Sequence, residues 1–231
     1  MLPSILVLLL PRRCSAGPLH ILRELGALVS EPGVWDVWSP VMHDALPEPE
    51  GNACRLVEVS GIQMCVHNSS NYISNTLAST GRWKECSPLI EQASSHGTLI
   101  LELGGNIGAC SVQLLLRTNK VLIIFEPNPS NLFYLTNTLK RMQSSRPELA
   151  RRAFVYPIGI GDKPIQSVIV EAIGNSGDST VGRLPKREGH MWPHAGAVYN
   201  ITIRPLDAIF PHGLAPEAVS LMKLDVQGTH D

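Results

Sequence analysis

The chain has 231 residues, of which 44% are hydrophobic and 17% charged, enough for one domain of ordinary size with an appendage. Its formal net charge is only −1 and no basic stripe runs along it, so we exclude nucleic acid as a partner. The five cysteines lack metal-ligand spacing, so no metal site is predicted, and their odd number argues against a full disulfide framework. We expect Cys110 to be a small buried hydrophobe.

Residues 1–50 are expected to form an N-terminal arm outside the core. Its first part, 1–16, contains the apolar run Ile5–Leu10, which is too short to cross a bilayer, so no transmembrane span is predicted. The run resembles the core of a signal peptide, but the positive charges of Arg12 and Arg13 follow it instead of preceding it. The compartment is left open, and we favour the cytoplasm over the secretory pathway.

Two further features depend on how this arm packs and on whether the chain is secreted. Trp35 and Trp38 can either fold back onto the domain or contact a partner. The sequons at Asn68-Ser69-Ser70 and Asn200-Ile201-Thr202 carry glycans only in a secreted chain, and the strand predicted around Asn200 makes that sequon the less suitable one.

A preface of hairpin and helices is predicted over residues 51–97. Apolar and polar residues alternate through 54–67 around Ser60-Gly61, which predicts a β-hairpin. Helical patterns follow over 73–83 and 88–94.

The core begins with a short apolar strand, Leu99–Leu103, a turn rich in small residues and then a helix. This order of elements opens a nucleotide-binding βαβ unit. The dinucleotide pattern is broken, however, because Asn106 stands where its second glycine belongs. Glu102 would also repel a pyrophosphate at the helix N-terminus, and it suits a ligand that carries positive charge.

A second buried strand is predicted over Val121–Glu126 and ends in an acid. Glu126 should lie at the carboxyl edge of the neighbouring parallel strand, where an acid can accept both hydroxyls of a ribose. A nucleoside without phosphates that is joined to a cation fits these residues. S-adenosylmethionine has this composition.

The remaining elements follow in order. Asn128 and Pro129 begin a helix with an apolar face. Four more strands are predicted, of which the second and third pair with each other: 153–158, 167–171, 198–203 and 219–225. The loop between the paired strands, 174–197, is long enough to be functional or disordered.

Three motifs in this order resemble the FkbM family of S-adenosylmethionine-dependent methyltransferases. They are Glu102–Gly108, Phe125–Pro129 and Met222–Gly228, and the match extends from about residue 60 to the end. Glu102, Gly105 and Gln227 depart from the commoner Asp, Ala and Glu. The third departure replaces a carboxylate by an amide at that position.

The resemblance implies an α/β, Rossmann-like class I methyltransferase fold, with a mostly parallel sheet and helices on both faces, over residues 98–231. It also implies cofactor contacts at the carboxyl edge of that sheet. The cofactor residues we expect are Glu102, Gly104, Gly105, Asn106, Gly108, Glu126, Pro127 and Asp162. Asp162 would meet the adenine amine, but it can equally be a turn-forming acid.

The implied function is methyl transfer to an acceptor oxygen of a small molecule or glycan. Asp225 is the candidate general base, with a structural role as the alternative. The alternative function is a catalytically incomplete cofactor-binding remnant or interaction module, and a dinucleotide oxidoreductase is disfavoured by Glu102 and Asn106. The acceptor's identity and the oligomeric state cannot be read from the sequence.

The sequence also indicates truncation, because it stops after the fourth core strand. We therefore expect the strand at 220–225 to have one unpaired edge, with poor solubility as the consequence. Glu102, Glu126 and Asp225 should converge on one crevice.

Overall fold

Four parallel strands form the centre of the computed structural model, which describes residues 6–8, 37–47, 53–69, 71–93, 96–172, 179–182, 195–210, 214 and 216–226. The main sheet has the order β1-β11-β4-β5-β6, and β11, β4, β5 and β6 run parallel. The strands are β1 (Leu6–Leu8), β4 (Leu99–Leu103), β5 (Val121–Phe125), β6 (Ala153–Tyr156) and β11 (Val219–Leu224). The predicted core strands and the α/β fold class are confirmed, with 99–103 in the middle.

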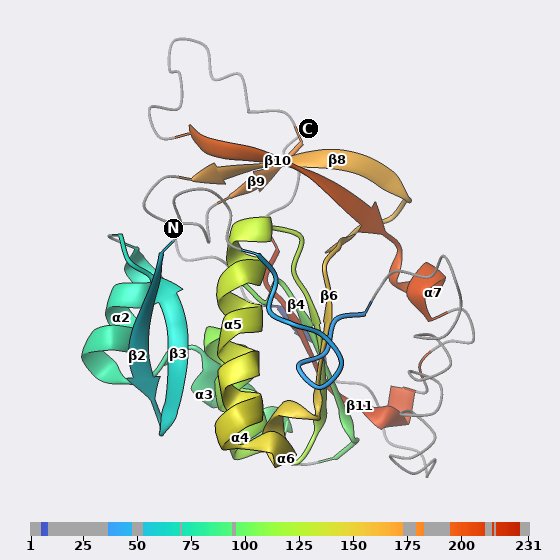
Figure 1. The fold of residues 1–231 in the computed structure, drawn as a ribbon. Helices are drawn as coiled ribbons and strands as arrows, with labels where there is room; N and C mark the ends of the chain where they lie inside the picture. Colours follow the sequence, from blue (N-terminus) through green and yellow to red (C-terminus); the bar gives the residue numbers. More distant parts are fainter. Residues whose placement is uncertain are drawn as a thin grey trace.

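Two long helices cover one face of this sheet (Figure 1). They are α4 (Ala109–Arg117) and α5 (Pro129–Ser145), and the short α6 (Pro147–Ala150) follows. The Asn128 side chain caps α5 by accepting a hydrogen bond from the Ser130 N–H, as the sequence predicts. On the other face, α7 (Leu206–Ile209), Val37 and Phe210 pack against the odd-numbered residues of β4 and β5.

The outer edges of the main sheet are both covered. Strand β1 pairs antiparallel with β11, with Leu6 opposite Leu224. The expectation that 220–225 has an unpaired edge is therefore wrong, because a three-residue strand from the N-terminal arm pairs along it. On the other side Trp38 forms an antiparallel bridge with Val155 of β6 and is itself 4% exposed. Trp35 lies outside the described residues, as do residues 1–5 and 9–16.

The preface consists of a hairpin packed beside α5 and two helices, of which the first packs on the hairpin and the second on α4 (Figure 1). Strands β2 (Cys54–Val59) and β3 (Ile62–His67) pair antiparallel, which confirms the predicted hairpin. Helix α2 (Tyr72–Thr80) ends earlier than predicted because Gly81 adopts φ +65° and closes it. Helix α3 (Cys86–Ala93) follows.

Four of the five cysteines form disulfides. Cys54 is bonded to Cys65 across the hairpin, and Cys86 of α3 is bonded to Cys110 of α4. The expectation that Cys110 is a free buried hydrophobe is wrong, although it is 4% exposed. The odd number of cysteines was a poor guide to disulfides, because pairing depends on which cysteines the fold brings together. Cys14 lies outside the described residues.

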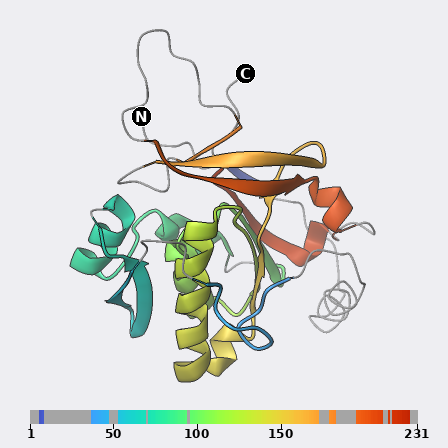
Figure 2. The same cartoon turned by 45° about the horizontal axis from the view of Figure 1, so that its top comes forward.

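A second sheet lies across the carboxyl ends of the main strands, above the start of α5 (Figures 1 and 2). Its order is β7-β10-β8-β9. The strands are β7 (Gly159–Ile160), β8 (Ile165–Ala172), β9 (Thr180–Val181) and β10 (Ala195–Arg204). The antiparallel pairing of β8 with β10 confirms the predicted strand pair, and a short 3-10 helix η2 (Pro216–Ala218) precedes β11.

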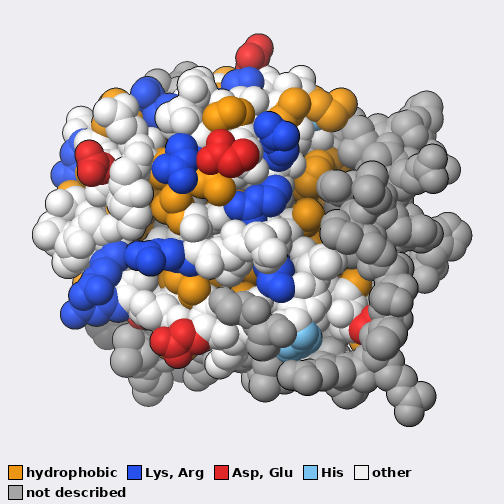
Figure 3. All heavy atoms as spheres, turned by 90° about the horizontal axis from the view of Figure 1, so that it is seen from below, with side chains coloured by type: hydrophobic (Ala, Val, Ile, Leu, Met, Phe, Trp, Pro, Cys, Tyr) orange, Lys and Arg blue, Asp and Glu red, His pale blue; other side chains and the backbone are white. Residues whose placement is uncertain are grey.

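Lys and Arg side chains gather with a few acids on the face at the foot of α5 and α6 (Figure 3). One exposed ion pair near α6 joins Arg146 to Glu148 at 3.0 Å. Because this face is more basic than the net charge of the chain indicates, the exclusion of nucleic acid remains a prediction. Within the described ranges no helix has the length and apolar character needed to cross a membrane.

Candidate functional site

The site begins with the turn between β4 and α4. Gly104 and Gly108 both have φ +87°, a conformation that side-chain-bearing residues rarely adopt. A Cβ on Gly104 would collide with the backbone carbonyl of Asp225, and one on Gly108 would lie 2.7 Å from Leu135 Cδ1. The glycines are needed here because strand β11 and helix α5 approach the turn so closely.

Hydrogen bonds hold the turn in place from two sides. The N–H groups of Gly104 and Gly105 both donate to the Phe125 carbonyl, at 2.9 and 3.1 Å. Asn106 adopts φ +50°, and its side-chain oxygen accepts the Ile107 N–H at 2.7 Å. The predicted role of Asn106 in fixing the turn agrees with this geometry.

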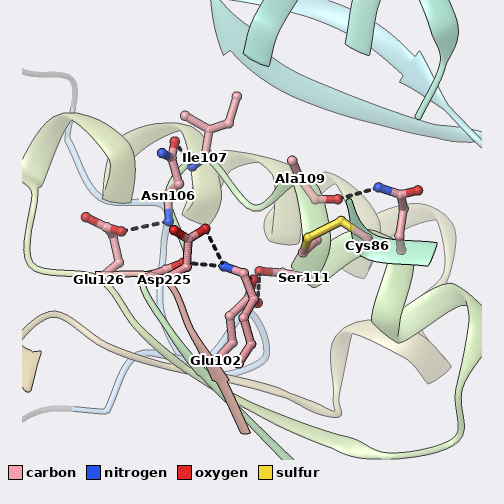
Figure 4. A network of polar contacts seen from close by, with 12 residues as sticks. Cys86, Glu102, Asn106, Ile107, Ala109, Ser111, Glu126 and Asp225 are labelled. Carbon is pink, nitrogen blue, oxygen red and sulfur yellow. Dashed lines mark hydrogen bonds and ion pairs between the residues drawn. A yellow bond between two sulfur atoms is a disulfide. The ribbon is translucent and has the colours of Figure 1, made fainter. Parts of the chain in front are cut away.

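Glu126 lies directly beyond β5 and is 4% exposed (Figure 4). Its Oε2 accepts the Asn106 N–H at 2.7 Å, and its Oε1 accepts the Asn128 N–H at 2.9 Å and the Asn131 side chain at 3.3 Å. Burial raises the pKa of Glu126, although the N–H donors of Asn128 and Asn106 oppose that shift. The carboxylate is thus fixed against the glycine turn, and among the described residues Oε2 accepts from a single donor.

A buried ammonium joins the other two acids of the site. Lys223 Nζ lies 3.3 Å from Glu102 Oε1 and 3.4 Å from Asp225 Oδ2, and it donates to the Gly104 carbonyl at 2.8 Å. Glu102 is fully buried, and its Oε2 accepts the Ser111 hydroxyl at 2.6 Å. Lys223 and Ser111 therefore lie against the two oxygens of Glu102, and this buried carboxylate acts through these neighbours.

The charges of this group influence one another. Burial alone would lower the pKa of Lys223, but Glu102 and Asp225 outweigh burial and raise it. Burial raises the pKa of Glu102, against the attraction of Lys223. The charge of Lys223 also opposes the rise in the pKa of Glu126, so one ammonium acts on both buried acids.

The structure brings together Glu102 and Asp225 through Lys223, and Glu126 with the turn (Figure 4). Asp225 is the exposed member, with a third of its side chain accessible. Three carboxylates face one ammonium, which leaves an excess of negative charge when all are ionised. Such a group of charges favours a ligand that carries positive charge.

Two predicted cofactor residues, Pro127 and Asp162, make none of the polar contacts described above. Pro127 follows Glu126 and lies beside Gly159 of β7. Asp162 lies beyond β7, is highly exposed and pairs with Lys163 at 3.6 Å. Gln227, the departure from the family motif, lies outside the described residues.

Lys223 is a site residue that the sequence motifs did not predict. Its signal was available, since a lone lysine inside the apolar run Val219–Leu224 is unusual unless it is paired. Ser111 and Asn131 were also missed, and nothing in the sequence marks them because helices carry many such polar residues.

The second sheet contributes another polar group beside the start of α5. The Ser130 hydroxyl lies 3.3 Å from Glu171 Oε2 and 3.1 Å from the Tyr199 hydroxyl. The Asn128 side chain donates to Ser179 at 3.4 Å. Burial raises the pKa of Glu171, against its hydrogen bond with Ser130. These contacts tie the second sheet to the helix that follows Glu126.

Comparison with known proteins gives one family and two weak structural matches. The model described as "Methyltransferase FkbM domain" matches residues 102–229, more than half of the chain. No curated protein matches this sequence.

The two solved structures come from archaea. Wild-type Trm5b from Pyrococcus abyssi is 16% identical, with 46% of this chain and 28% of that chain covered and a TM-score of 0.33. PH0793 from Pyrococcus horikoshii, described as a transferase, is 14% identical, with 47% and 37% covered and a TM-score of 0.35. The chain thus spans less than two-fifths of the length of either one.

The family match covers the glycine turn, Glu126 and Asp225, the residues that the geometry brings to the carboxyl edge of the sheet. The chain belongs to the FkbM methyltransferase domain family.

Proposed function

We propose that this chain binds S-adenosylmethionine at the crevice formed by Glu126, the glycine turn and Asp225, and transfers its methyl group to an acceptor oxygen. The observation that carries the proposal is the position of Glu126, buried at the carboxyl end of β5 and hydrogen-bonded to the turn at Asn106. An acid in this position suits the two hydroxyls of a ribose. The excess of carboxylates over ammonium suits the sulfonium and ammonium charges.

The residues present fit this group on one further count. Asn131 Oδ1 is a buried acceptor without a hydrogen-bond partner among the described residues, and its amide nitrogen donates to Glu126. A ribose hydroxyl would satisfy that acceptor. Pro127 and Asp162 would lie on the nucleoside side, and Asp162 would need to turn inward from its exposed position.

When bound, S-adenosylmethionine would supply a methyl carbon activated by sulfonium; the acceptor oxygen would bond to that carbon as the carbon–sulfur bond breaks and its electron pair moves to sulfur. Asp225 would take the hydroxyl proton, because it is the partly exposed carboxylate of the site. Lys223 holds Asp225 and the Gly104 carbonyl at fixed positions. The second sheet, which Ser130 links to α5, would exclude water from the site at the carboxyl ends of the main strands.

We propose a small molecule or glycan as acceptor. The basic face of Figure 3 lies at the foot of α5 and α6, whereas the crevice lies at the opposite ends of the strands. A nucleic acid held by that face would therefore lie away from the crevice.

The test is transfer of an isotope-labelled methyl group from S-adenosylmethionine to pools of hydroxyl compounds and glycans. Labelled product that is lost in the folded Asp225→Asn variant supports oxygen methylation with Asp225 as base. Cofactor binding without transfer to any pool would favour the binding-module alternative. Labelled nucleic acid would overturn the acceptor class.

A further inference from the structure

The two disulfides bear on the compartment in which the chain matures, and this inference does not depend on the proposed function. The Cα atoms are 5.3 Å apart in the Cys54–Cys65 pair and 5.4 Å apart in the Cys86–Cys110 pair, both within the usual range for disulfides. Cys65, Cys86 and Cys110 are buried at 0–4% exposure. The bonds are therefore part of the packed structure, and the Cys86–Cys110 bond joins the preface to the helix that follows the glycine turn (Figure 4).

Disulfides persist in oxidising compartments and are rare where glutathione and thioredoxin keep thiols reduced. A fold with two of them, and with no metal-ligand cluster among its described residues, indicates maturation in an oxidising compartment. We propose that this chain matures in such a compartment and that Asn68 and Asn200 carry N-linked glycans there. This proposal reverses the preference for the cytoplasm drawn from the sequence.

Asn68 lies at the surface just after β3. Both Asn68 and Ser69 are exposed, in a bend between the end of β3 at His67 and the start of α2 at Tyr72. A glycan on Asn68 would project into solvent without displacing any part of the hairpin.

Asn200 lies on the outer face of the second sheet. In β10 the residues Tyr199, Ile201 and Ile203 point to the inner side, where Ile201 and Ile203 are 4% and 8% exposed. Asn200 alternates with them and is exposed, next to Val198, which is 59% exposed on the same side. A strand position does not prevent glycosylation at Asn200, because an outward side chain keeps the sugar outside the core.

Disulfide formation and N-glycosylation both use reactants that an oxidising compartment of the secretory pathway supplies. Each disulfide forms by exchange with an oxidised dithiol protein, whose own disulfide is reduced to two thiols as two cysteine thiols of this chain become one disulfide. In glycosylation the asparagine amide nitrogen bonds to the anomeric carbon of a lipid-linked oligosaccharide. The carbon–oxygen bond to the lipid diphosphate breaks with its electron pair moving to oxygen, and the amide nitrogen loses a proton.

The glycan test uses the full chain behind a cleavable signal in eukaryotic cells, followed by endoglycosidase digestion. Ser69→Ala keeps the sequon of Asn68 and should retain the mobility shift, whereas Ser70→Ala should lose one step of it. Ile201→Val and Thr202→Ala form the matched pair for Asn200. Absence of a shift, or the same shift in both members of a pair, would overturn that glycan site.

The compartment test counts thiols by alkylation and mass spectrometry in denaturant. The secreted chain should show one free thiol before reduction and all five after it. The chain made in a reducing cytosol should show five and melt at a lower temperature. Five free thiols in the secreted chain, or equal melting of both forms, would overturn the compartment claim without affecting the proposed function.

Discussion

Lys223 and Glu102 form a buried ion pair, 3.3 Å apart, between neighbouring parallel strands, and they are cross-strand partners in the register of β11 and β4. Lys223 is 4% exposed and Glu102 is fully buried. The same ammonium reaches the Gly104 carbonyl and Asp225. Strand pairing and the candidate site therefore depend on one side chain.

Replacing Lys223 by Met should destabilise the fold by about 3–5 kcal/mol, because it leaves Glu102 as a buried carboxylate without a counterion. The measurement is the free energy of unfolding in urea. Adding Glu102→Gln to Lys223→Met should recover part of the loss. Lys163→Met is the control, since Lys163 is 77% exposed and should change stability by no more than about 0.5 kcal/mol. Equal effects at both lysines would contradict the role of the ion pair.

Gly104→Ala should cost more than Gly61→Ala, although both glycines have φ above +80°. The backbone conformation alone costs about 1–3 kcal/mol at either position. At Gly61 nothing lies within 4 Å of an added Cβ, whereas at Gly104 the Asp225 carbonyl must also move. Urea unfolding of the two variants compares the costs. Equal destabilisation would mean that the Asp225 carbonyl, just after β11, can move away from the turn without a further cost in free energy.

His67 should make the fold sensitive to acid. It is 6% exposed, its ring lies 4.0 Å from that of Tyr134, and burial lowers its pKa from 6.5 to about 4. The unfolded chain binds a proton below its pKa of 6.5 while the folded chain does not, so the stability is complete above that pH and is lost as the pH falls toward 4.

The measurement is urea unfolding at about pH 7 and about pH 5, where the unmodified chain should lose about 2 kcal/mol more than His67→Gln. If both chains lose the same stability, His67 is not the titrating group.

The double variant Cys86→Ser/Cys110→Ser should lose about 3 kcal/mol of stability, because a closed loop with a sequence separation of 24 no longer restricts the unfolded chain. Thermal unfolding under non-reducing conditions measures the loss. Cys14→Ser is the control, since neither disulfide of the structure uses it. Unchanged melting of the double variant would show that this bond does not stabilise the folded chain.

The sequence predicts the central strands well because each is a short apolar run bounded by polar or small residues. Leu99–Leu103 and Val121–Phe125 are buried at every position, and a strand covered on both faces carries that pattern.

Contacts between distant segments could not be predicted in this way. The pairing of Leu6–Leu8 with β11, the bridge from Trp38 to Val155 and the bond from Cys86 to Cys110 all join residues without any shared local pattern. For the candidate site, the sequence identified the acids at the strand ends but missed Lys223, whose significance depends on its neighbours in the next strand.

Calorimetric titration of S-adenosylmethionine into the folded chain and into Glu126→Gln tests the central claim most directly. The chain should bind, and the variant should bind more weakly by about 1–3 kcal/mol, roughly 5- to 150-fold, because the ribose hydroxyls lose a charged acceptor. Glu148→Gln, at the opposite end of the sheet and exposed beside Arg146, should bind as the unmodified chain does. Equal affinity in folded Glu126→Gln and Glu148→Gln, or no binding to the unmodified chain, would contradict the account.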